Sequence, residues 1–193
     1  MRKLKKVQKL AADALFEFAV KTLAGRASSS AELAAKLRLK AERAEDVDAT
    51  IARLKDLNYL DDARFAESFA HARVENNGFG RMRVLSDLRA RRVSSKLADN
   101  AVNAVFEEKD EDALIDAYIA RRIPSLAAHR SLGSHGAHGS EEQEDRAARD
   151  RRLGSAYRRL QRAGFRSGAI LAALKRAGAP EDLEEPDEAE AES

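Results

Sequence analysis

The chain has 193 residues with no cysteine or tryptophan, and 44% of its residues are hydrophobic but only 5% aromatic. The lack of cysteine excludes disulfides, thiolate metal sites, iron–sulfur clusters and cysteine nucleophiles. Alanine and leucine supply most of the apolar content and arginine much of the charge, and this mixture favours helices over sheets. We therefore expect an all-α protein.

The formal net charge of +2 conceals an uneven distribution. Residues 181–193 contain eight acidic residues and no basic one, so residues 1–180 carry a net charge of +10. A cationic body indicates a polyanionic partner, usually nucleic acid. The acidic tail is then either an internal competitor for that partner or a solubilising segment.

No stretch is apolar for long enough to span a membrane. The longest apolar run covers residues 169–174, whereas a span needs about 20 residues. Behind the basic start of the chain, Asp13 and Glu17 interrupt what would be the core of a signal peptide. We expect a cytoplasmic protein without membrane association.

Residues 11–60 show helical spacing of apolar residues in three successive stretches, after a basic N-terminal segment 1–10. Ser29 or Ser30 is placed to cap the second helix, and Glu32 is positioned to complete a capping box. The apolar stripes consist of Leu15, Phe18, Ala19 and Leu23, then Leu33 and Leu37, then Val47, Ile51 and Leu54.

Residues 61–109 repeat this arrangement. Asp61 is placed to cap the next helix, Asp62 suits the positive end of that helix, and Leu60 is spaced to pack against Phe65. Gly78 supplies the left-handed conformation that ends it. Two further stripes follow, at Val84, Leu85 and Leu88, and at Leu97, Ala98, Val102 and Val105.

Residues 110–178 hold a third set of helices with an insertion. A helix over 110–122 ends before Pro124. Residues 125–146, rich in Gly, Ser and His and then in Glu, are expected to be a flexible insertion. Helical spacing returns at Leu153, Tyr157 and Leu160 and at Ile170, Leu171 and Leu174, and residues 179–193 are expected to be a disordered acidic tail.

Apolar positions in these three segments recur at a fixed period. Leu37 and Leu88 are 51 residues apart and Leu88 and Leu160 are 72 apart, which becomes 50 once the 22-residue insertion is removed. Such a period predicts tandem repeats that pack on their neighbours. The expected fold is three three-helix modules, 11–60, 61–109 and 110–178, which form an elongated, curved helical stack.

The sequence has no pattern typical of catalysis. It lacks a phosphate loop and a His-Glu-x-x-His pair, and Gly78–Gly80 is a lone Gly-x-Gly that reads as a tight turn. Three of its four histidines lie in the insertion without carboxylates to brace a metal. We expect no enzyme activity, no cofactor and no metal site.

Two segments are strongly basic: residues 78–96 have a net charge of +5 and residues 146–178 of +9. Arginine predominates, and its planar, multi-donor group suits phosphates and carboxylates, although an arginine-rich helix often only solvates its surface. The residues that we expect to contact DNA or a partner are Arg64, Arg73, Arg81, Arg83, Arg89, Arg91, Arg92, Lys96, Arg158, Arg159, Arg162 and Arg166.

Several motifs closely resemble those of the RecX regulatory proteins. They are Ser28–Leu37, Asn58–Ala66, Arg73, Gly78–Gly80, Leu88–Val93 and Arg162–Phe165, in the family's order and spacing over about residues 12–178. Tyr59, Leu60, Asp61, Asp62, Phe65, Gly78, Gly80, Gly164 and Phe165 match motif positions that we expect to be structural. The departures are Asn58 for Gly, Arg81 for Pro, Asp87 for Glu and Arg92 for the Gly of a turn.

The resemblance implies a monomeric regulator of DNA repair, homologous recombination and the SOS response. It would bind the RecA recombinase filament on single- and double-stranded DNA and inhibit ATP hydrolysis, strand exchange and filament growth, without a cofactor. Two alternatives remain from the residues alone. One is a stand-alone helical DNA-binding protein, and the other is a scaffold whose basic face binds acidic protein partners.

Overall fold

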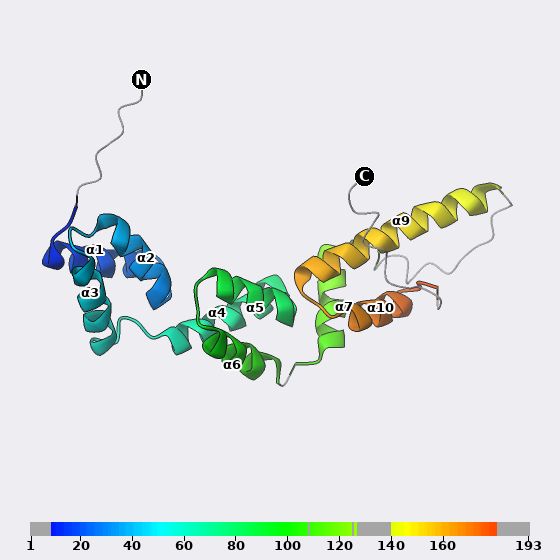
Figure 1. The fold of residues 1–193 in the computed structure, drawn as a ribbon. Coiled ribbons are helices and arrows are strands. Elements are labelled where there is room, and N and C mark those ends of the chain that lie inside the picture. The colour runs from blue at the N-terminus through cyan, green and yellow to red at the C-terminus, as the bar shows by residue number, and fades with distance from the viewer. Residues whose placement is uncertain (1–8, 108, 125, 127–139, 181–193) are drawn as a thin grey trace, which may run out of the picture. The chain divides into compact units, whose positions relative to one another are not determined.

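A computed structural model describes residues 9–107, 109–124, 126 and 140–180, and all regular elements within these ranges are helices (Figure 1). Leu10 and Ala41 form an isolated parallel bridge there, without a strand. The predicted all-α class is confirmed. The helices are α1 (Ala12–Gly25), α2 (Ser30–Lys40), α3 (Ala44–Asp56), α4 (Asp62–Asn77), α5 (Arg81–Ala90), α6 (Ser95–Phe106), α7 (Glu111–Arg122), α9 (Ser140–Ala163) and α10 (Ser167–Arg176).

The chain divides into two compact units, which we call unit 1 and unit 2. Unit 1 comprises residues 1–70 and 87–104, and unit 2 comprises residues 71–86 and 105–193. The division falls within α4, α5 and α6. The three module boundaries expected from the sequence stay a prediction.

The core of unit 1 lies among α1, α2 and α3, which pack on one another (Figure 1). Each helix contributes the apolar stripe expected from its spacing, and Phe18, Leu23 and Ile51 lie at the edge of the cluster. The buried members are Leu15, Ala19, Leu33, Ala34, Leu37, Ala41, Val47, Leu54 and Leu60.

The core of unit 2 lies where α10 packs against α7 and α9. Tyr118 meets Phe165 edge to face with ring centroids 5.8 Å apart, and Arg176 of α10 pairs with Asp112 of α7 at 3.3 Å. The larger buried side chains of this core are Ile115, Tyr118, Ile119, Ile123, Leu126, Leu153, Tyr157, Leu160, Phe165, Ile170 and Leu174.

The turns that end α5 and α9 share one backbone geometry. The amide of Val93 donates to the carbonyl of Leu88 at 3.2 Å, and the amide of Phe165 donates to the carbonyl of Leu160 at 3.4 Å. The residue before each donor is left-handed, with φ of 60° at Arg92 and 91° at Gly164. A non-glycine residue resists this conformation by about 1–2 kcal/mol, yet the departure from glycine at position 92 does not abolish the turn.

Part of the predicted flexible insertion is helical, which corrects that expectation. Helix α9 begins at Ser140, so residues 140–146 form its first part. Leu126 is buried in the core of unit 2. Residues 140–146 are mostly Glu, Gln and Arg, which are strong helix formers. The remaining insertion residues 125 and 127–139, the tail residues 181–193 and residues 1–8 lie outside the described residues.

No helix in the described part of the chain is both long and apolar enough to cross a membrane.

Candidate nucleic-acid interface

Asp61 and Asp62 cap two different helices of unit 1. The Asp61 carboxylate accepts hydrogen bonds from the amides of Ala63 and Arg64, both at 3.0 Å, and so caps α4 as predicted. The Asp62 carboxylate accepts from the amide of Ser30 at 2.7 Å, at the first residue of α2. The Asp-Asp pair therefore satisfies free amides at two helix starts.

Ser29 links the start of α2 to the end of α5 within unit 1. Its hydroxyl accepts from the amide of Glu32 at 3.1 Å, which makes Ser29 the cap of the two predicted candidates, and donates to the carbonyl of Arg91 at 2.6 Å. The Glu32 carboxylate accepts from Nε of Arg91 at 2.6 Å, so its strong partner lies in the turn after α5 and not in a capping box. Arg91 also donates to the carbonyl of Ala27 at 2.7 Å.

Two aromatic rings complete the surroundings of Arg91. Its guanidinium lies 5.2 Å from the ring centre of Phe65 and 5.5 Å from that of Phe69. The side chain of Arg91 is 14% exposed and that of Glu32 is 18% exposed. Arg91, which we expected to contact a partner, is therefore engaged inside unit 1 and holds three segments of the chain together.

The other predicted basic residues of unit 1 lie on its surface. Arg64 is exposed in the first turn of α4, and Arg92 and Lys96 are exposed around the turn between α5 and α6. Arg89 is also exposed and lies 4.0 Å from Asp99, a separation at which an exposed pair contributes little to stability. Arg89, Arg92 and Lys96 thus form a small cationic group around one turn.

A backbone contact between two glycine turns organises unit 2. The amide of Gly80 donates to the carbonyl of Ala163 at 2.8 Å, and the amide of Met82 donates to the carbonyl of Gly164 at 3.1 Å. A Cβ atom at Gly80 would lie 2.5 Å from the Gly164 oxygen, and one at Gly164 would lie 2.2 Å from the Arg83 nitrogen. Both positions therefore require glycine, because the two backbones lie too close for a side chain.

This contact brings two basic segments together. Arg81 and Arg83 lie in the first turn of α5, Arg162 lies in the last turn of α9, and all three are exposed. Arg83 also lies over the ring of Phe79, 5.4 Å from its centre. Arginines from residues 78–96 and from residues 146–178 thus meet at one place in unit 2.

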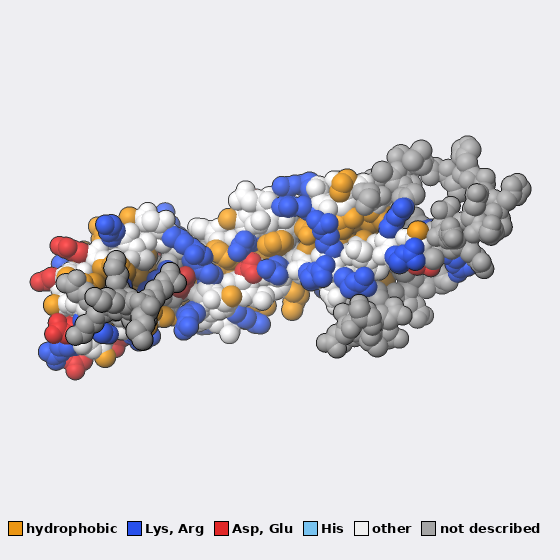
Figure 2. Space-filling view, turned by 90° about the horizontal axis from the view of Figure 1, so that it is seen from above, with side chains coloured by type: hydrophobic (Ala, Val, Ile, Leu, Met, Phe, Trp, Pro, Cys, Tyr) orange, Lys and Arg blue, Asp and Glu red, His pale blue; other side chains and the backbone are white. Residues whose placement is uncertain are grey.

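Helix α9 extends this cationic region along its exposed side. Arg151, Arg158 and Arg162 are spaced by seven and four residues, which places them on one helix face. Arg152 and Arg159 lie beside that face and are also exposed. Figure 2 shows Lys and Arg side chains gathered over the half of the view that contains α9, with few acidic side chains among them. We call Arg81, Arg83, Arg151, Arg152, Arg158, Arg159 and Arg162 the arginine surface.

Two other predicted residues of unit 2 are engaged with neighbouring side chains. The half-buried Arg73 lies 5.9 Å from the ring centre of Phe79 and 3.5 Å from the Asn77 amide oxygen. Arg166 donates through Nε to the Glu111 carboxylate at 2.6 Å, and this hydrogen bond raises the pKa of Arg166. Arg73 therefore contributes to the packing of unit 2, whereas Arg166, whose side chain is 74% exposed, forms an ion pair with Glu111 at the surface.

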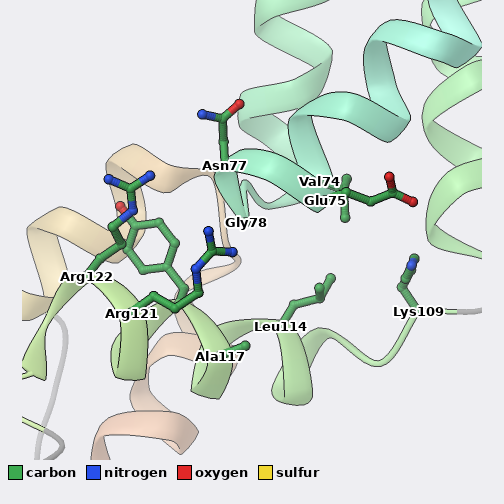
Figure 3. Close-up of a pocket in the computed structure, with 10 residues that line it drawn as sticks. Val74, Glu75, Asn77, Gly78, Lys109, Leu114, Ala117, Arg121 and Arg122 are labelled. Carbon is green, nitrogen blue, oxygen red and sulfur yellow. The ribbon is translucent and has the colours of Figure 1, made fainter.

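A pocket of about 200 Å³ lies between the end of α4 and α7 in unit 2 (Figure 3). Val74 and Leu114 are apolar residues of its lining, and Arg121, Arg122 and Lys109 are its basic residues (Figure 3). Tyr118 also lines the pocket. Its acidic residue is Glu75, and no Ser, Thr, Cys or His lines it. Among the described residues, no group of three His, Asp or Glu side chains is arranged to hold a metal ion.

Sequence reasoning singled out most of the arginine surface but missed Arg151 and Arg152. Their signal was available in the seven-residue spacing from Arg151 to Arg158 and from Arg152 to Arg159. The partnership of Glu32 with Arg91 was also missed. It joins residues 59 positions apart, and the position of Glu32 behind Ser29 pointed to a local capping role instead.

Known proteins are similar to this chain in sequence and in fold. The family model for the second three-helix domain of RecX matches residues 61–102. The regulatory protein RecX of Deinococcus radiodurans is 30% identical over 178 residues, covering 92% of this chain and 74% of that protein. That of Trichlorobacter lovleyi is 30% identical over 152 residues, covering 79% and 88%. The crystal structure of RecX from Lactobacillus salivarius matches with a TM-score of 0.64 at 16% identity, covering 86% of this chain and 96% of that one.

The similarity to the solved structure shows that the helical fold is shared. The similarity in sequence shows the family to which the chain belongs. The match to the Deinococcus radiodurans protein spans most of both chains, and the family model falls on the segment that holds the Asp-Asp cap and the Gly-x-Gly turn. One partner of each contact described above, Asp62 and Gly80, therefore lies within the matched segment. The chain belongs to the RecX family of regulatory proteins.

Proposed function

We propose that this protein binds the RecA recombinase filament on DNA and inhibits its activities, including ATP hydrolysis, strand exchange and filament growth. The observation that carries the proposal is the arginine surface, because arginines from two separate sequence segments meet through the Gly80–Gly164 contact in a member of the RecX family. Guanidinium groups bind phosphate oxygens through two parallel hydrogen bonds, which suits a DNA backbone.

The surface suits a repetitive partner. Arg151, Arg158 and Arg162 follow the axis of α9 over 11 residues, a length of about 16 Å at 1.5 Å per residue. Single-stranded and filament-bound DNA presents phosphates at regular intervals over such a length, and several weak contacts on one rigid helix add to a strong one. Contacts made along a filament hinder the addition and movement of its protomers.

The direct test measures ATP hydrolysis by RecA on single-stranded DNA with this protein added below one copy per recombinase protomer. We expect the wild-type chain to inhibit ATP hydrolysis and the double variant R158E/R162E to lose most of that inhibition. The matched control is R38E/K55E, which makes the same change of charge at exposed residues of α2 and α3.

The outcomes separate the candidate functions. Inhibition that is lost in R158E/R162E but kept in R38E/K55E supports the proposal. A wild-type chain that binds DNA but leaves ATP hydrolysis unchanged at every ratio would contradict it and favour a stand-alone DNA-binding protein. Binding to acidic proteins without binding to DNA would favour a scaffold.

A further inference from the structure

The described chain ends beside α9, immediately before the acidic segment 181–193. Arg149 of α9 donates a hydrogen bond through Nη2 to the carbonyl of Gly178, and the amide of Ala179 donates to the carbonyl of Leu174 at 2.9 Å. These two contacts fix the chain beside α9 just before the acidic residues start.

The charges of the two segments are complementary. Residues 181–193 contain eight carboxylates and no cation, whereas residues 146–163 contain seven arginines and Asp150 as their one acid. At low ionic strength charges of opposite sign attract over about 30 Å, and at physiological ionic strength over about 8 Å. The acidic segment is therefore attracted to the arginines of α9, the helix beside which the described chain ends.

The length of the segment is sufficient for this contact. Arg162 lies 13 residues beyond Arg149 on α9, an axial distance of about 20 Å. The 13 residues of 181–193 reach at most about 45 Å when fully extended. The carboxylates are thus able to meet every exposed arginine of α9.

We propose that the acidic segment 181–193 binds the exposed arginines of α9 within the same molecule and competes there with the phosphates of DNA. The inference rests on the proposed function, because it assigns a regulator to the same surface. DNA binds only when the segment is displaced, and the apparent affinity for DNA falls in proportion to the fraction of free surface. A recombinase filament, which presents many phosphates together, displaces the segment more readily than a short free strand.

The test uses a full-length variant in which all eight acids of 181–193 are changed from Glu to Gln or from Asp to Asn. Binding to a fluorescently labelled single strand is measured by anisotropy across a salt series. We expect the neutral segment to tighten binding by roughly 3- to 10-fold at low salt, as a surface occupied about 70–90% of the time requires. The difference disappears at high salt because the attraction is screened.

A thermodynamic cycle separates docking from a general change in net charge. The neutral segment is combined with R158E/R162E and, as the matched control, with R38E/K55E. Docking on α9 predicts that neutralisation no longer affects DNA binding in R158E/R162E but still tightens it in R38E/K55E. An equal effect in both backgrounds would overturn the proposed contact, because only the net charge would then matter.

A measurement without DNA or recombinase locates the contact directly. The NMR signals of the arginine Nε–H groups are compared between the wild-type and the neutral-segment proteins. Shifts at Arg158, Arg159 and Arg162 support docking on α9. Shifts confined to Arg121 and Arg122 would assign the segment to the pocket of Figure 3. The absence of any shift would indicate that the segment only increases solubility. Either of the last two results overturns the inference. If neither the wild-type chain nor any variant inhibits RecA, the proposed function is contradicted but the docking is not. The NMR signals of the arginines report docking independently of RecA.

Discussion

The Nε atom of Arg91 lies 2.6 Å from a carboxylate oxygen of Glu32, 59 positions away in the chain. The pair is largely shielded from water, and the Arg91 carbonyl accepts a second bond from Ser29 at 2.6 Å. Within unit 1, the end of α5 is thus fixed to the start of α2 through one residue. A surface arginine would be replaceable at little cost, whereas this one has partners on every side.

Changing Arg91 to Ala should lower the free energy of unfolding by about 2 kcal/mol, because the Glu32 carboxylate loses its partner in a poorly hydrated site. Lysine at this position should recover only part of the loss, since it lacks the planar group that serves Glu32 and Ala27 together. Urea denaturation followed by circular dichroism measures both. Arg64 to Ala is the control and should change the value by less than about 0.5 kcal/mol; a similar loss there would contradict the structural role of Arg91.

Changing Gly80 or Gly164 to Ala should destabilise the protein by at least about 2 kcal/mol. The new Cβ would lie 2.5 Å or less from backbone atoms, and backbone atoms move less readily than the end of a side chain. Gly168 in α10 is the matched control, because a Cβ there meets nothing within 4 Å. Alanine at 168 should be neutral or stabilising by up to about 1 kcal/mol. Thermal unfolding of the three variants tests the contact, and equal melting temperatures would show that the two turns do not touch.

Changing Arg92 to Gly should stabilise the protein by about 0.5–1 kcal/mol. The position has φ of 60°, and glycine avoids the steric cost that Arg92 bears there. The net stabilisation is smaller than this cost, because glycine loses more conformational entropy on folding. Asn58 to Gly should gain less, because asparagine tolerates its φ of 58° better. Arg92 to Ala keeps the strain and serves as the control. A stability of the glycine variant below that of the alanine variant would contradict the left-handed turn.

The double change R158E/R162E should weaken binding to single-stranded DNA and flatten its dependence on salt. The loss of two phosphate contacts lowers the slope of log affinity against log salt by about 1.4. Helix content and melting should stay nearly the same, because exposed charges contribute little to stability. Anisotropy titrations at several salt concentrations give the slope, with R38E/K55E as the control. A slope equal to that of the wild type would place these two arginines away from DNA.

Local features of the fold could be predicted from the sequence because they depend on neighbouring residues. The apolar stripes that became the cores of the two units follow helical spacing, and the caps at Ser29 and Asp61 are formed by residues within three positions. The Gly78–Gly80 turn was also predictable as a turn. Each of these signals lies within a single helix or its ends.

Contacts between distant residues were beyond such reasoning. Nothing in the local sequence distinguishes Arg91, which is engaged inside unit 1, from Arg92, which is exposed. The fit of Gly80 to Gly164 depends on the docking of two helix ends, and a single sequence carries no sign of that pairing. The helical start of α9 was not predicted, because the preceding Gly-Ser-His stretch indicates a flexible segment and no apolar stripe marks residues 140–146 as a helix.

The Gly80–Gly164 contact makes the alignment of two helix ends independent of the charge of the surface around them. Its hydrogen bonds run from backbone to backbone, so the alignment of the two helix ends does not depend on the side chains that project around it. Substitutions at Arg81 or Arg162 leave this alignment in place, and selection is free to retune the charge of the surface while the glycines stay fixed. Relatives of this protein should therefore diverge in the arginines before they diverge in the turns, and a designer who wishes to redirect binding has a scaffold whose geometry survives the exchange of its recognition residues.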